Sequence, residues 1–486
     1  AEAAGTARLA LTICGAAKAY VNGRPAGWLA PATRNAPDRV EFDAELHAGD
    51  NEIAIWFEDL CERDAVVRIA VNWLSGPVAR ASHSFDADDD TVAGIARAIG
   101  AMHLDAKRYD GGAIMLILPH PFARDMAGEV SIGGHFMSHD HIVLPMNIPA
   151  GADRVGIALA ADLPADYRYF DFTLATGALS VEARLGAEIS HRTAIGPAPA
   201  DPARRIDETL RWIAEHAESD TETALACAAV GDSAARARAE RIIAGELPGI
   251  EDCFDCADFA LVPLLWTRIA YGDRLSDALR ARIDAATLDF RYWMDEPGND
   301  VQWYFSENHA LLFHTAAYLA GGLLPEARFR RSGRLGREQS KVGYDRLMGW
   351  FDHFEAAEMA EFNSATYFPI DLKGMTALFA LAPDADIRAR AARAIARLIT
   401  VVAHSAHHGV ITGAQGRSYE HSLCTADTQE LTGMARLLWG IGSFGAHVNC
   451  LPQLALCLRD HGLALPDLGA IACWEDAAQA QEWMFS

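Results

Sequence analysis

Residues 203–217 read ARRIDETLRWIAEHA, and the pattern of the whole chain changes at this stretch. Its apolar residues Ile206, Leu210 and Ile213 recur with the spacing of one helix face. Counting this one, about ten stretches between here and the end of the chain show the pattern, and each is followed by Gly, Pro, Asn or Asp. We expect about ten to twelve antiparallel helices. The absence of a fixed sequence period favours paired helices that close a toroid over a repeat solenoid.

The part of the chain before this stretch predicts β-structure from residue 8 to about residue 190. Short apolar or alternating runs are separated by clusters of Gly, Pro, Asn and Asp, which is typical of β-sandwiches. Examples are RLALTICG (8–15), AVVRIAVNWL (65–74) and YRYFDFTLA (167–175). A helical insertion is expected at about residues 90–102, between two β-regions.

These patterns together predict a multidomain protein of α and β structure. A β-sandwich is expected over residues 1–85, a second β-rich region over 86–200 and a C-terminal (α/α) toroid over 201–486. The Pro-rich stretch IGPAPADPARR, residues 195–205, interrupts both periodicities and is the expected linker between the β-rich part and the helices.

Composition excludes several classes of protein. Of the 486 residues, 51% are hydrophobic, yet no apolar run reaches the ~18 residues of a membrane span. Lys and Arg number 42 against 66 Asp and Glu, so the net charge of −24 argues against a binder of duplex nucleic acid. Nine scattered cysteines and the lack of a signal-peptide pattern favour a cytoplasmic over a secreted protein.

Three polar clusters interrupt the helical part, and the first is WYFSENHALLFH, residues 303–314. Ser306 is the expected N-cap of a helix, which puts Glu307, Asn308 and His309 in its first turn. The partial positive charge of a helix N-terminus favours a bound carboxylate and a neutral imidazole. The alternative is that these side chains only cap the helix.

The second cluster is EFNSATYFPIDL, residues 361–372. It places Glu361, Asn363, Ser364 and Tyr367 in a loop before the next helix, with proline fixing the backbone. So many hydrogen-bonding groups between apolar helices must bond either one another or a ligand. A self-satisfied turn is therefore the alternative.

The third cluster is GAQGRSYEH, residues 413–421. Its glycines would let the backbone approach a ligand closely. Arg417 offers a bidentate clamp, Tyr419 a stacking surface and Glu420 an acid. Taken alone, the stretch is equally compatible with an ordinary loop between helices.

Histidines in GGHFMSHDH, residues 133–141, are the other candidates for ligands. His135, His139 and His141 could bind a metal together with Asp140, because alternate residues of a strand share one face. Histidines in a turn or on the surface are the favoured alternative. We expect neither a metal nor a cofactor.

The three clusters carry a family resemblance. The helical part resembles the α/α-toroid carbohydrate-active enzymes, which include polysaccharide lyases of the alginate-lyase and heparinase type and related glycoside hydrolases. The order Asn308-His309, then Tyr367, is similar to the Asn-His … Tyr arrangement of those lyases. The resemblance implies that Asn308 binds a uronate carboxylate, that His309 and Tyr367 move protons, and that Arg417 steadies the carboxylate or lowers the pKa of the tyrosine.

The N-terminal part resembles the galactose-binding-like β-sandwich of many glycan-active enzymes. The residues that carry this resemblance are AYVNGRPAGW (19–28) and ELHAGDNEIAIWF (45–57). In that arrangement Asn-Gly forms a hairpin turn, and Ala-Gly-Asp-Asn precedes a core strand.

The favoured function is therefore a lyase that cleaves a uronate-containing glycan by β-elimination. One alternative is a glycoside hydrolase, for which Glu307, Glu361 and Glu420 are the candidate carboxyl groups. The other is a glycan-binding protein without catalysis. The expected partner is an oligosaccharide or polysaccharide, and the expected substrate-binding residues are Trp303, Tyr304, His314, Asn363, Tyr419 and Glu420. Both enzyme hypotheses require that the three clusters meet around one water-accessible hollow.

Overall fold

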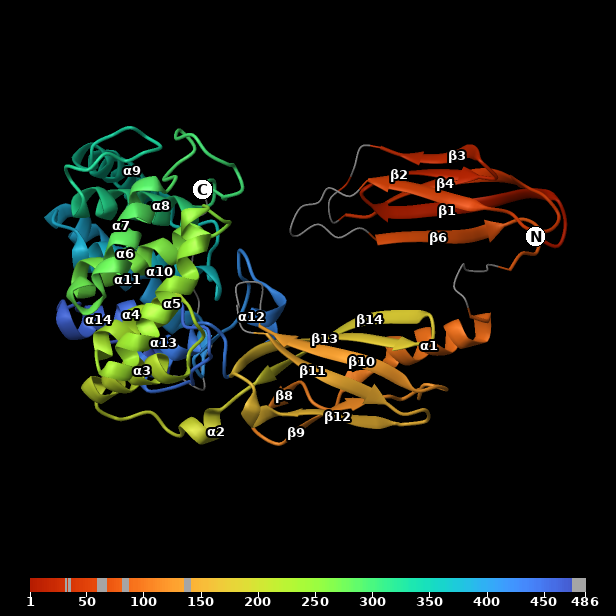
Figure 1. Ribbon diagram of the computed structural model, residues 1–486, viewed down its shortest axis with the longest axis horizontal. Helices are drawn as coiled ribbons and strands as arrows, with labels where there is room; N and C mark the ends of the chain where they lie inside the picture. Colours follow the sequence, from red (N-terminus) through yellow and green to blue (C-terminus); the bar gives the residue numbers. More distant parts are fainter. Residues whose placement is uncertain (31–32, 34–35, 59–67, 81–86, 135–140, 474–486) are drawn as a thin grey trace. The chain divides into compact units, whose positions relative to one another are not determined.

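The computed structural model describes residues 1–486 apart from 31–32, 34–35, 59–67, 81–86, 135–140 and 474–486. Its contacts divide the chain into two compact units, residues 1–90 and 91–486. Strands come first and helices follow, which confirms the predicted order of a mixed α and β protein (Figure 1).

The first unit contains two three-stranded antiparallel sheets around an apolar core. Their strand orders are β4-β1-β6 and β3-β2-β5. The core includes Leu9, Leu11, Ala19 and Phe42. The strands are β1 (Gly5–Cys14), β2 (Ala16–Val21), β3 (Arg24–Leu29), β4 (Asp38–Leu46), β5 (Ile53–Glu58) and β6 (Arg68–Ser75).

Two predictions about this unit have opposite outcomes. Asn22 and Gly23 link β2 to β3 with φ of 50° and 75°, which confirms the predicted Asn-Gly hairpin turn. The expectation of a core strand after Ala-Gly-Asp-Asn is wrong. That strand, β5, is an edge of its sheet, and Trp56 on it is 73% exposed.

The second unit begins with a helix and two sheets that enclose their own core. The predicted helical insertion is confirmed as α1 (Asp89–Ala101). One sheet has the order β11-β10-β13-β14-β8 and the other β12-β9-β7 (Figure 1). The strands are β7 (His103–Leu104), β8 (Arg108–Tyr109), β9 (Ala113–Ile117), β10 (Met126–Gly133), β11 (Ile142–Ile148), β12 (Arg154–Leu159), β13 (Asp166–Thr176) and β14 (Leu179–Ile189).

Helices form the rest of the second unit, and acidic or hydroxyl caps start several of them. Asp201 accepts a hydrogen bond from the N–H of Ala203, and Asp220 does the same for Thr223. The helices are α2 (Arg192–Ile195), α3 (Pro202–His216), α4 (Thr221–Val230), α5 (Ser233–Glu251), α6 (Ala257–Tyr271), α7 (Asp277–Asp289), α8 (Glu307–Leu323), α9 (Gly336–Ala357), α10 (Tyr367–Leu381), α11 (Ala385–Ser405), α12 (Glu420–Cys424), α13 (Thr432–Trp439), α14 (Leu451–Asp460) and α15 (Gly469–Ala472). Short elements complete the unit: η1 (Ala160–Asp162), η2 (Gly272–Arg274), β15 (Ala406–His407) and β16 (Val410–Ile411).

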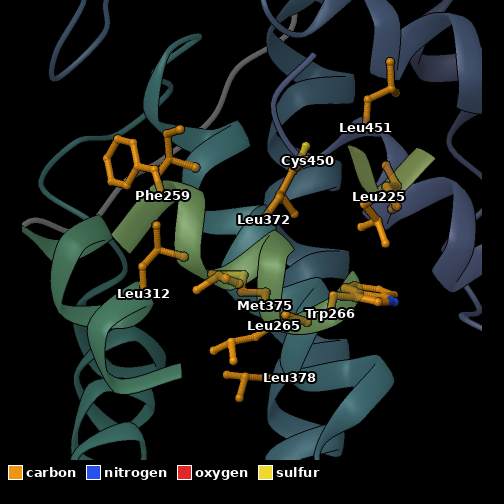
Figure 2. Close-up of a cluster of buried hydrophobic side chains, with 14 of the residues drawn as sticks. Leu225, Phe259, Leu265, Trp266, Leu312, Leu372, Met375, Leu378, Cys450 and Leu451 are labelled. Carbon is orange, nitrogen blue, oxygen red and sulfur yellow. The ribbon is translucent and has the colours of Figure 1, made fainter. Parts of the chain in front are cut away.

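The helices fall into two groups by burial. Helices α4, α6, α8 and α10 are buried along most of their length, whereas α3, α5 and α11 alternate between buried and exposed residues. Each buried helix contacts the next, and α14 contacts both α10 and α4. Figure 2 shows the shared core, in which Leu312 of α8 and Leu372 of α10 lie among side chains from the other buried helices.

Two further properties concern the described residues only. Within them, no helix is both long enough and apolar enough to cross a bilayer. Their cysteines are all free thiols, and most are buried.

A buried carboxylate joins the β-rich and helical parts of the second unit. Glu188, at the end of β14, is 1% exposed. Its Oε1 accepts hydrogen bonds from the N–H groups of Ala426, Asp427 and Thr428 at 3.0, 2.7 and 2.8 Å, and from the Thr428 hydroxyl at 3.0 Å. Four hydrogen bonds to one buried oxygen make a strong contact, so this group fixes β14 against the segment that follows α12.

We expect Glu188→Ala to destabilise the second unit by about 3 kcal/mol, because buried N–H groups would lose their acceptor. Thermal unfolding followed by circular dichroism measures the effect. Glu182→Ala is the matched control, since Glu182 lies on the same strand but is exposed. Equal melting temperatures for the two variants would contradict the assigned role of Glu188.

Candidate active site

The three polar clusters of the helical part lie together in the structure. Asn308 of α8 contacts Glu361, and Glu361 contacts Arg417. Ser364 and Tyr367 then contact Arg417 and Tyr419. Side chains about 50 and 110 positions apart in the sequence therefore form one continuous group.

Glu361 lies at the centre of this group. Asn308 Nδ2 donates to Glu361 Oε2 at 2.7 Å, and Arg417 Nη1 lies 3.5 Å from Glu361 Oε1. The side chain is only 14% exposed, and this burial raises the pKa of Glu361. Asn308 and Arg417 act in the opposite direction and lower that pKa, without offsetting the effect of burial.

Glu307 places a second carboxyl group beside Glu361. Ser306 accepts from the N–H of His309, which confirms the predicted N-cap and places Glu307 first in α8. Glu307 Oε1 accepts from the N–H of Ala360 at 3.0 Å, and Oε2 accepts from the N–H of Glu361 at 3.2 Å. The negative charge of Glu307 is a further cause of the raised pKa of Glu361.

Arg417 connects Glu361 to a chain of two phenol groups. The Tyr367 and Tyr419 hydroxyls are 2.7 Å apart, and Arg417 Nη2 donates to the Tyr419 hydroxyl at 2.7 Å. The Arg417 guanidinium lies 5.0 Å from the centre of the Tyr367 ring. Burial, reinforced by the bond to Tyr419, raises the pKa of Tyr367. Arg417 acts in the expected direction and lowers the pKa of Tyr367, but the effect of burial is larger and the net pKa is raised.

Hydrogen bonds between the loops fix the second and third clusters to each other. Asn363, with φ of 50°, donates to the carbonyls of Thr412 and Ala414 at 3.1 and 3.0 Å. A Cβ on Gly416 would lie 2.3 Å from the carbonyl oxygen of Ala360. Gly416 therefore lets another loop approach its backbone closely, whereas the sequence predicted that a ligand would do so. The amide nitrogen of Asn363 bonds the same loop and not the expected substrate.

The second cluster also starts a helix earlier than predicted. Tyr367 is the first residue of α10, and Pro369 lies in its first turn. Proline is tolerated there because the first N–H groups of a helix have no partner within the helix. Tyr367 therefore lies at the start of a helix and not in a loop.

His309 is held by an acid that the sequence analysis did not select. Its Nδ1 lies 2.8 Å from Oδ2 of Asp258, which is fully buried in the first turn of α6. The His309 ring stacks on Phe259 with 4.6 Å between the ring centroids. Phe259 follows Asp258 in α6 and is labelled in Figure 2. A carboxylate at Nδ1 favours the tautomer whose Nε2 accepts protons.

Asp371 is the second acid that the sequence analysis missed. It lies one helical turn after Tyr367, is fully buried, and has no hydrogen-bond partner for either oxygen among the described residues. Burial, with the charges of Glu361 and Glu307, raises its pKa well above the ordinary value. Asp258 and Asp371 share a property visible in the sequence, since each is an isolated acid in an apolar helical stretch.

The buried pair of His421 and Glu430 supports the ring of Tyr419. The rings of His421 and Tyr419 stack with centroids 5.6 Å apart and planes 10° from parallel. His421 Nε2 lies 2.9 Å from Glu430 Oε1. Burial alone would raise the pKa of Glu430, but the hydrogen bond and charge of His421 lower it to about 2. Glu430 thus holds His421 in place for the stack.

Several predicted binding residues take no part in the contacts of Glu361 described above. Tyr304 and His314 are 2% and 6% exposed and pack with Phe313 and Trp293, so we assign them to the core in place of the expected substrate contact. Burial lowers the pKa of His314 to about 3. Glu420 is exposed and accepts from the Tyr167 hydroxyl at 2.8 Å. Trp303 is 45% exposed.

The candidate metal ligands receive no support from the described residues, which contain no cluster of three His, Cys, Asp or Glu side chains able to hold a metal ion. His135, His139 and Asp140 lie outside the described residues.

Comparisons with known proteins return no match in sequence, either to a protein-family model or to a curated protein. Solved structures give only weak similarities. An α-L-rhamnosidase from Aspergillus terreus is 10% identical with a TM-score of 0.29, over 94% of this chain and 73% of that one. An α-L-rhamnosidase from Streptomyces avermitilis, complexed with L-rhamnose, is 13% identical with a TM-score of 0.25, over 82% and 51%.

A glycosyl hydrolase family 2 member from Bacteroides cellulosilyticus is 12% identical with a TM-score of 0.14. The similarity covers 38% of this chain, which spans only 26% of that protein. With TM-scores this low, the function has to be argued from the residues of this chain.

Asp371→Asn tests the buried acid. Because the pKa of Asp371 is raised on folding, its contribution to stability is fully present below pH ~3.8 and is lost as the pH rises, by about 1.4 kcal/mol per pH unit, up to its pKa in the folded state. The asparagine variant lacks this loss, so its melting temperature relative to wild type should increase between pH 4 and pH 7. A difference independent of pH would show that Asp371 is ionised in the folded protein.

Proposed function

We propose that the protein is a carbohydrate-active enzyme and that it hydrolyses glycosidic bonds. The observation that carries this proposal is the carboxyl pair Glu307 and Glu361, in which Glu361 has a raised pKa and lies between Asn308 and Arg417. Glycoside hydrolysis uses two carboxyl groups, one of which must hold a proton at the working pH.

The environments of the two groups suggest different roles. Burial favours the protonated form of Glu361, which therefore suits the general acid that protonates the leaving oxygen. Two backbone N–H groups orient the carboxylate of Glu307, which suits the base or nucleophile. Tyr419 is partly exposed, and its hydroxyl, which accepts from Arg417, can also bond a sugar hydroxyl.

The proposal extends to the fold that carries the site. We propose an (α/α) toroid over residues 201–486, supported by the succession of contacts from α4 through α6, α8, α10 and α14 back to α4. The β-rich regions over 1–85 and 86–200 are the proposed accompanying domains. Buried free thiols fit a reducing compartment, so we propose the cytoplasm.

Elimination from a uronate is the second candidate, and one observation favours it. Asn308 and Arg417 converge on a carboxylate, that of Glu361, as they would have to converge on the carboxylate of a uronate. The raised pKa of Tyr367 disfavours it, because the base of an elimination must lose its proton easily. Hydrolysis therefore ranks first.

The central experiment is Glu361→Gln, which keeps the shape of the side chain and removes the acid. We expect kcat on oligosaccharides to fall by about 10²–10⁴-fold, measured as the release of reducing ends. Glu355→Gln is the control, because Glu355 is a surface residue paired with Arg393. Full activity of Glu361→Gln would refute the proposed role.

The same panel of substrates separates hydrolysis from elimination. Hydrolysis predicts reducing ends without new absorbance near ~235 nm, where the conjugated product of elimination absorbs. Tyr367→Phe should retain most activity under hydrolysis, because Tyr367 moves no proton. An absorbing product that disappears in Tyr367→Phe would establish the lyase.

The pH profile tests the electrostatics of Glu361. An acid catalyst is active when protonated, so activity should fall as the pH rises through the pKa of Glu361. The Arg417 cation lowers that pKa, and Arg417→Met should therefore shift the alkaline limb of kcat/KM to higher pH. Arg393→Met, a change on the exposed face of α11, should leave the limb unchanged. A shift to lower pH would contradict the assignment.

A further inference from the structure

An aromatic face lies on the first unit, in residues 1–90, outside the site described above. Trp28 on β3 and Trp56 on β5 are 69% and 73% exposed. In the register of the sheet, Lys18 on the central strand β2 is opposite both tryptophans. Opposed residues point to the same side of a sheet, so the three side chains form a row across it.

This face departs from the usual use of residue types in a sheet. On β2 the small residues Ala17 and Ala19 are buried in the core, whereas the large indoles are on the outside of the neighbouring strands. Exposure leaves much of each indole in water, although burying such a side chain would stabilise the fold. Two adjacent exposed tryptophans are therefore better explained by binding than by folding.

The row borders a hollow of about 230 Å³. Lys18 and Glu58 bring opposite charges to it, and Ala16, opposite Glu58 in the sheet, also lines it. The Lys18 ammonium lies 5.8 Å from the centre of the Trp28 ring. Among the described residues, neither Lys18 nor Glu58 forms an ion pair, so both can serve a ligand.

We propose that this hollow binds a neutral sugar ring of an oligosaccharide. The face of an indole suits the C–H face of a pyranose, Lys18 donates to hydroxyl oxygens, and Glu58 accepts from hydroxyl groups. The opposite charges of Lys18 and Glu58 favour an uncharged ligand with many hydroxyl groups over a uronate or a phosphate. This site is separate from Glu361 and does not depend on the proposed hydrolysis.

The test uses the full chain and a panel of neutral gluco-, galacto-, manno- and xylo-oligosaccharides, with oligogalacturonate as the acidic comparison. Binding is measured by calorimetry and by tryptophan fluorescence. For at least one neutral oligosaccharide we expect a Kd below about 1 mM. Trp28→Ala and Trp56→Ala should each weaken it about tenfold, and Trp56→Phe should restore part of the affinity.

Control variants separate this hollow from sugar binding elsewhere on the molecule. Trp73→Ala removes an exposed indole of the other sheet, on β6, and should leave affinity unchanged. Glu355→Gln, a change on the surface of α9, should also leave affinity unchanged. Melting curves show whether each variant is folded.

Three results would overturn the proposal. They are no neutral oligosaccharide bound below 1 mM, binding of the acidic probe alone, or unchanged affinity in both tryptophan variants. If the tryptophan variants instead lower the melting temperature without affecting sugar binding, the face is a packing surface.

Discussion

The contact of Glu361 with Asn308 and Arg417 is the interaction on which the candidate site depends. It joins the start of α8, the segment before α10 and the loop before α12. A buried carboxyl group needs such donors, because desolvation without partners is costly. These donors lower the pKa of Glu361 by less than burial raises it, so Glu361 keeps its proton more readily than a surface glutamate does.

The pKa values of the carboxyl groups in the helical part differ because their surroundings differ. Glu430 is paired with His421, and its pKa is low, whereas Asp371 has no partner among the described residues, and its pKa is high. Asp258 instead orients His309. The pKa values of Glu430 and Asp371 are thus shifted in opposite directions, and perturbed pKa values of this kind are common at catalytic sites.

The two units expose aromatic residues in different ways. Around Arg417, the phenols of Tyr367 and Tyr419 are hydrogen-bonded to each other and partly buried. On the first unit, Trp28 and Trp56 are exposed to solvent on the outer side of a sheet. The first arrangement is rigid and suits chemistry on a positioned bond, whereas the second offers a broad face that suits binding.

The sequence by itself determined the order of strands and helices, the Asn22-Gly23 turn, the start of α8 at Ser306 and the three polar clusters, because these depend on local periodicity and capping. Only the tertiary structure decided which of their residues meet. Burial removed Tyr304 and His314 from the candidate site and raised the pKa of Tyr367. The tertiary structure also added Asp258, which contacts His309, and the buried Asp371. Desolvation depends on all the atoms that surround a group, and residues distant in the chain supply most of them.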